Sequence, residues 1–102
     1  MTISFPPKHA SAIKKLVFDF ISNLAVGETI STQVVTATVW SGTDASPSAI
    51  ISGAATAAGT KVTQTITGGV VGVFYKLTCT ITTSAGQTLI MIGYLAIISD
   101  PL

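Results

Sequence analysis

The fold is decided by the stretch Gly72–Ile98, which begins Gly-Val-Phe-Tyr-Lys-Leu-Thr-Cys-Thr-Ile-Thr-Thr at residues 72–83. Apolar side chains at every second position alternate there with Lys and Thr, which is the period of a strand with one buried face. Thr83–Gly86 supplies the small residues of a tight turn, and the apolar segment Leu89–Ile98 follows it. The pattern predicts a long β-hairpin whose first strand contributes four core residues: Tyr75, Leu77, Cys79 and Ile81.

Similar alternation recurs along the chain. It is clearest at Ile30–Trp40 and Thr60–Thr67, and Ser48–Ser52 suits a further short strand. Gly53–Gly59 is rich in Ala, Thr and Gly, which is typical of a loop or a weak edge strand. About seven short strands, with turn residues roughly every 8–12 positions, predict an all-β antiparallel β-sandwich. We assign it residues 12–102 and expect these further core residues: Phe18, Phe20 and Val35.

The segment Ala12–Leu24 has two interpretations. Its apolar residues recur at helical spacing, but Leu16, Phe18 and Phe20 also alternate with Lys, Val and Asp as they would in a strand. Aromatic residues favour strands, so we predict a strand here and keep a helix as the alternative.

Residues 1–11 contain Phe5-Pro6-Pro7, and two prolines enforce an extended backbone that cannot pair regularly. We therefore predict an extended N-terminal arm. It is either a disordered tail or a segment that docks on a neighbouring subunit through Phe5.

Tyr75 lies at the start of the second-last predicted strand, just after Gly72. This position is typical of a tyrosine corner, in which the hydroxyl bonds to the backbone of the preceding loop. The alternative is an ordinary core tyrosine.

The composition restricts the classes of partner. Of 102 residues, 48% are hydrophobic and 9% are charged, and the formal net charge is +1. So few charges indicate that partner subunits cover part of the surface. The basic residues are scattered, so we expect no nucleic-acid partner. Leu89–Ile98, the longest apolar stretch, is about half the length of a membrane helix, so we expect no membrane contact.

The titratable residues form no catalytic or metal-binding motif. The one histidine, His9, lies in the arm, and one cysteine, Cys79, allows no internal disulfide and suits a reducing cytoplasm. We therefore predict a non-enzymatic protein with no cofactor, no metal and no small-molecule ligand. The acidic residues are far apart in sequence: Asp19, Glu28, Asp44 and Asp100.

Three parts of the chain carry a family resemblance: Pro7-Lys8 with Ile13–Phe20, Leu24–Ile30, and Gly68-Gly69 with Tyr75–Thr88. In order and spacing they are similar to small phage virion proteins described as fibre–tail adaptors or virion-associated structural proteins. The resemblance covers roughly residues 7–98. It implies an immunoglobulin-like sandwich and favours a strand at Leu16–Phe20.

The chain departs from that family at the start of the last strand, where charged residues are expected and Leu89, Ile90 and Met91 are apolar. Exposed apolar faces of this kind mark interfaces. Trp40 and Tyr94 suit sheet packing or an interface, and alternatively stacking on sugar rings. We predict a subunit interface formed by Phe5, Trp40, Ile90, Ile92, Tyr94 and Ile98.

The resemblance implies a structural subunit of a bacteriophage particle, assembled in the host cytoplasm, that acts as a neck or tail adaptor. Its expected partners are other virion proteins and copies of itself. A capsid decoration protein and a carbohydrate- or receptor-binding module are the alternatives.

Overall fold

The computed structural model describes residues 2–99. They form eight strands and one short 3-10 helix: β1 (Thr2–Ser4), β2 (Lys8–His9), β3 (Lys14–Asp19), β4 (Ile30–Ser41), η1 (Pro47–Ile50), β5 (Ile51–Ala58), β6 (Lys61–Ile66), β7 (Phe74–Thr83) and β8 (Thr88–Ile98). The sequence predicts about seven strands, and the N-terminal arm supplies the two shortest of the eight. Among the described residues no helix has the length and hydropathy that crossing a membrane requires.

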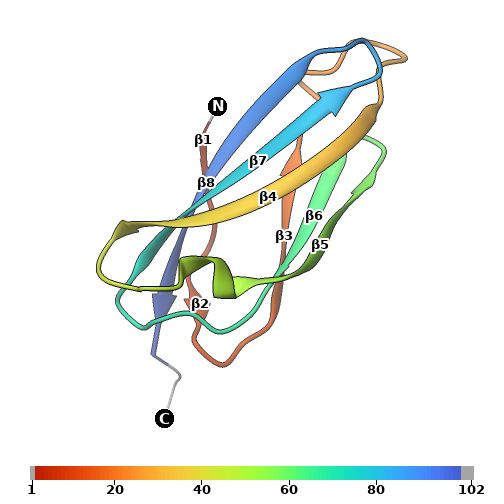
Figure 1. The fold of residues 1–102 in the computed structure, drawn as a ribbon. Coiled ribbons are helices and arrows are strands. Elements are labelled where there is room, and N and C mark those ends of the chain that lie inside the picture. The colour runs from red at the N-terminus through yellow and green to blue at the C-terminus, as the bar shows by residue number, and fades with distance from the viewer. Residues whose placement is uncertain (1, 100–102) are drawn as a thin grey trace.

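The strands form two sheets in a sandwich-like arrangement (Figure 1). One sheet has the order β1-β8-β7-β4, with β2 also paired to β8, and the other has the order β3-β6-β5. The two arm strands run parallel to β8, and all other pairs are antiparallel. The all-β prediction is therefore confirmed. The domain is elongated, measuring 47 × 22 × 21 Å along its principal axes.

The central hairpin is β7–β8, with Tyr75 opposite Leu95 and Thr82 opposite Thr88. Because side chains alternate across a strand, one face of β7 points between the sheets and the other points outward. The inward face of β8 packs beside it with Met91 and Leu95. All seven side chains expected in the core are buried: Phe18, Phe20, Val35, Tyr75, Leu77, Cys79 and Ile81.

The segment after the arm is a strand, so the helical alternative is wrong. β3 pairs with β6 and turns Leu16 and Phe18 into the core. The helical stripe would have buried Ile13 and Ile21, but Ile13 is 70% exposed and Ile21 is also exposed.

The arm lies along β8 of its own chain and pairs with it, although the two prolines predict an arm without regular pairing. β1 and β2 pair with β8 on either side of the two prolines, which interrupt the ladder because they lack N–H groups. Between them, the Phe5 ring packs edge-on against Phe18 with 5.4 Å between centroids. It also covers Gly93, where an added Cβ would lie 2.3 Å from a Phe5 ring carbon.

The short strand predicted at Ser48–Ser52 is wrong in its first half. Pro47 begins a 3-10 turn, because its fixed φ suits the first helical position, and Ile50 enters the core from that turn. The strand that follows is the edge of the smaller sheet, and it covers most of the segment interpreted as a loop or a weak edge strand.

Candidate functional site

Five of the six predicted interface residues gather on the outward face of the larger sheet, whereas the ring of the sixth, Phe5, packs on Phe18 in the core. Ile90, Ile92, Tyr94 and Ile98 alternate with buried residues along β8 and all point away from the core. Ile90 is 52% exposed and Ile98 is also exposed, whereas Ile92 and Tyr94 are half-buried. A β8 strand with apolar residues on both faces is therefore observed, as the sequence predicts.

Trp40 joins this face from the far edge of the sheet. Its ring lies 4.9 Å from the Tyr94 ring and 6.1 Å from the Phe74 ring, measured between centroids. Trp40 is 59% exposed, so these contacts leave most of the side chain uncovered. The register shift between Val39 and Ser41 marks an irregularity of β4 at this point.

The three aromatic rings border a shallow groove of about 300 Å³. The arm forms its other wall, so this segment shapes a surface of its own domain. Sequence reasoning missed Phe74, although the alternation that turns Tyr75 inward also turns Phe74 outward. We call this site the aromatic groove, and its lining residues are Ser4, Phe5, Pro7, Trp40, Phe74, Tyr94 and Ala96.

The face around the groove carries almost no charge. Threonines fill most of the outward positions of β4 and β7, and Lys76 is the one charged side chain that β4, β7 and β8 turn outward. Such a face presents no carboxylate and no imidazole. It suits contact with another uncharged surface.

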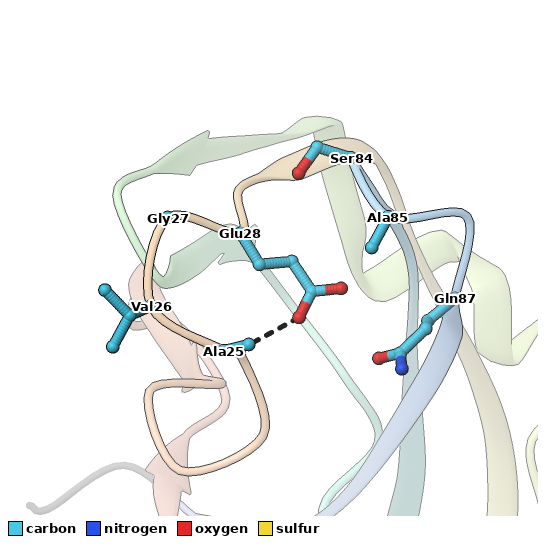
Figure 2. A pocket seen from close by; sticks show the side chains of 7 residues that line it. All are labelled: Ala25, Val26, Gly27, Glu28, Ser84, Ala85 and Gln87. Carbon is cyan, nitrogen blue, oxygen red and sulfur yellow. Dashed lines mark hydrogen bonds between the residues drawn. The ribbon is translucent and has the colours of Figure 1, made fainter.

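A second pocket, of about 360 Å³, lies at the β7–β8 turn and the β3–β4 loop. Figure 2 shows the Glu28 carboxylate directed toward Ala25, while Val26 points away from the pocket. One carboxylate oxygen accepts a hydrogen bond from the Ala25 N–H at 2.9 Å, and the other accepts one from the Thr83 hydroxyl. These bonds, that of Thr83 first, hold the pKa of Glu28 below its ordinary value. Both carboxylate oxygens of Glu28 are therefore engaged by the protein itself. We interpret these hydrogen bonds as a link that holds the two loops together, and we call it the loop clamp.

Ser84 completes the clamp. Its hydroxyl accepts a hydrogen bond from the Thr29 N–H at 3.0 Å, and its own N–H donates to the Thr29 carbonyl at 2.9 Å. The second and third segments of the family resemblance therefore meet in space at this end of the domain.

The tyrosine-corner prediction is confirmed. The Tyr75 hydroxyl accepts a hydrogen bond from the Val70 N–H at 3.0 Å and donates one to the Asp44 carboxylate at 2.6 Å. Burial, followed by the bond to Asp44, raises the pKa of Tyr75. The same bond, followed by the Ser46 N–H, lowers the pKa of Asp44. The corner thus ties two loops to one core residue. Tyr75 is also buried, as the alternative of an ordinary core tyrosine expects.

The other titratable groups are dispersed. His9 Nδ1 lies 3.0 Å from the Ser99 carbonyl oxygen, and Asp19, at the end of β3, accepts hydrogen bonds from the Ile21 N–H and the Thr60 hydroxyl. Burial raises the pKa of the Cys79 thiol to about 12. In residues 2–99 no cluster of three or more His, Cys, Asp or Glu side chains could hold a metal ion.

Over residues 8–91, the chain matches the family model described as podophage GP4 fiber-tail adaptor protein gp77. No curated protein and no solved structure matches it. The matched span contains both the loop clamp and the tyrosine corner.

Proposed function

Because the chain belongs to the family of podophage GP4 fiber-tail adaptor proteins, it is a structural component of the virion, and we propose that it acts without catalysis, by presenting a rigid sheet to its neighbours. An adaptor between fibre and tail contacts other virion proteins. We assign that contact to the outward face of β4, β7 and β8, and we include copies of the same chain among the partners.

The observation that carries this assignment is the exposure of three aromatic rings beside an apolar strand. Interfaces are rich in aromatic residues and depleted of charge, and large exposed apolar patches mark binding surfaces. Trp40, Phe74 and Tyr94 make this face rich in aromatic residues, and it has almost no charged side chains. Phe5 contributes through the wall of the aromatic groove.

An immunoglobulin-like topology is part of the proposal. In constant-type immunoglobulin domains one sheet contains strands B, E and D and the other contains C, F and G. The orders β3-β6-β5 and β4-β7-β8 correspond to these sets, with the arm added beside β8. The bond from Tyr75 to the preceding loop adds support. Such a sandwich holds the contact face flat and rigid.

A carbohydrate- or receptor-binding module is the second candidate, because the structure brings Trp40 and Tyr94 together. Recognition of sugars needs precisely placed polar groups as well as stacking. The lining of the aromatic groove offers few, chiefly the hydroxyls of Ser4 and Tyr94, so protein contact is favoured. Replacing Trp40 and Tyr94 by alanine separates the two: loss of adsorption by fully assembled particles supports the sugar site, and loss of assembly supports the adaptor surface.

The direct test of the proposed function is Ile92→Lys, which places a charge in the middle of the face. We expect the isolated variant to fold, since a lysine at a half-buried outward position can extend its ammonium group to water. Particles should then fail to incorporate it. Val17→Lys is the matched control, because Val17 is an exposed outward residue of the opposite sheet. Normal incorporation of Ile92→Lys would overturn the assignment.

A further inference from the structure

Lys76 lies within the uncharged face rather than at its rim. It is on β7, the middle strand of the three, with Thr38 opposite it on β4 and Tyr94 opposite it on β8. Lys76 is therefore the strand neighbour of Tyr94, which lines the aromatic groove. A partner that covers the groove also covers this lysine.

The chain offers Lys76 no counter-charge in the part that the structure describes. Three of the four acidic residues lie there, and each accepts hydrogen bonds elsewhere: Asp19 from Ile21 and Thr60, Glu28 from Ala25 and Thr83, and Asp44 from Ser46 and Tyr75. Within residues 2–99, the ammonium group of Lys76 forms neither a hydrogen bond nor an ion pair. Its charge is balanced only by solvent.

The face has the area of a small docking surface. Three strands about 4.8 Å apart, with outward residues spaced over about 27 Å, give a footprint of roughly 400 Å². Its apolar part lies along β8 and at Trp40 and Phe74, and exposed apolar patches mark interaction sites. Covering this footprint would remove Lys76 from water.

A second copy packed face to face on this surface does not balance the charge. Each copy would contribute one lysine and no carboxylate, so two ammonium groups would lose water without a counter-charge, which is costly. A different partner with one acidic side chain avoids that cost.

We propose that the outward face of β4, β7 and β8 receives a different virion protein, whose contact surface is uncharged and aliphatic or threonine-rich except for one Asp or Glu that pairs with Lys76. This inference rests on the proposed function, because it names the chemistry of the partner at the same surface.

The test uses the phage that encodes the protein, with Lys76→Glu, Lys76→Met and Lys76→Arg introduced separately. Like charges across an interface, or one unpaired buried charge, cost enough to lower affinity on the order of a hundredfold. We expect Lys76→Glu to lower the yield of infectious particles by that order, Lys76→Met to lower it at least tenfold, and Lys76→Arg to remain near wild type. Thermal unfolding of the isolated variants controls for folding.

Suppressor selection in the Lys76→Glu phage then identifies the partner. We expect compensating changes of one acidic residue to a neutral or basic one, in a single other virion protein. Wild-type yield with Lys76→Glu or Lys76→Met would overturn the inference and leave Lys76 as a solvated residue that limits aggregation. If particles also fail to incorporate Ile92→Lys, the proposed function would stand without this inference. Normal incorporation of Ile92→Lys would overturn both the proposed function and the inference about Lys76.

Discussion

The Tyr75 hydroxyl is the best place to measure what holds the loops to the core. Tyr75→Phe keeps the ring, which has 0% exposure, and removes only the two hydrogen bonds to Val70 and Asp44. A hydrogen bond contributes a net of about 1 kcal/mol to stability, so losing both should lower the free energy of unfolding by about 2 kcal/mol. In a domain of this size that corresponds to a fall in Tm of roughly 10 °C.

Thermal unfolding followed by circular dichroism at neutral pH measures this change. Asp44→Asn keeps an acceptor but removes the charge, so it is a milder perturbation of the same bond. If the hydroxyl acts through Asp44, the effects of the two substitutions should be non-additive in a double-mutant cycle. A fall in Tm of less than about 2 °C for Tyr75→Phe, under about 0.5 kcal/mol, would refute the reasoning, because the hydroxyl would then bind water equally well in the unfolded chain.

Two further predictions concern the arm and the loop clamp. Gly93→Ala should destabilise the domain by about 1–3 kcal/mol, because the new Cβ would overlap the Phe5 ring. Adding Phe5→Ala to the same chain should relieve the overlap. An unchanged Tm for Gly93→Ala alone would contradict this prediction. For Glu28, the bonds from Thr83 and Ala25 lower the folded-state pKa below its ordinary value of 4.5. Its stabilising contribution is therefore complete above that value and is lost as the pH falls through the lower folded pKa, so acid titration of the Tm should be flatter in Glu28→Gln.

Local patterns were sufficient for the parts of the fold that depend on one strand and its nearest turn. The alternation from Tyr75 to Ile81 identified β7, its buried face and the turn after it, because the period of side chains in a strand is fixed by geometry. For β3, the aromatic pair Phe18 and Phe20 outweighed a competing helical spacing, and the structure buries both. The strand predicted at Ser48–Ser52 begins later than the pattern indicates, because Pro47 starts a 3-10 turn whose last residue enters the core.

Contacts between distant segments could not be predicted in this way. The arm pairs with β8 because Gly93 leaves room for the Phe5 ring, and these two residues are far apart in sequence. The same limitation applies to the aromatic groove: alternation gives the outward direction of Tyr94 and Phe74, but only the sheet register places Trp40 beside them. Candidate residues were therefore predictable singly, and their assembly into one site was not.

The family match covers the scaffold and part of the contact surface. It ends at residue 91, so it includes the loop clamp, the tyrosine corner, Trp40, Phe74 and Lys76 but excludes Phe5, Ile92 and Tyr94. Hydrogen-bonded loops and an alternating core strand are what any partner would need from a rigid adaptor. An uncharged contact strand with a single lysine beside it suits only partners of matching chemistry. We therefore expect the choice of neighbour to reside in the outward residues of β8 and in Lys76, and the loop clamp and the tyrosine corner to keep that strand in place.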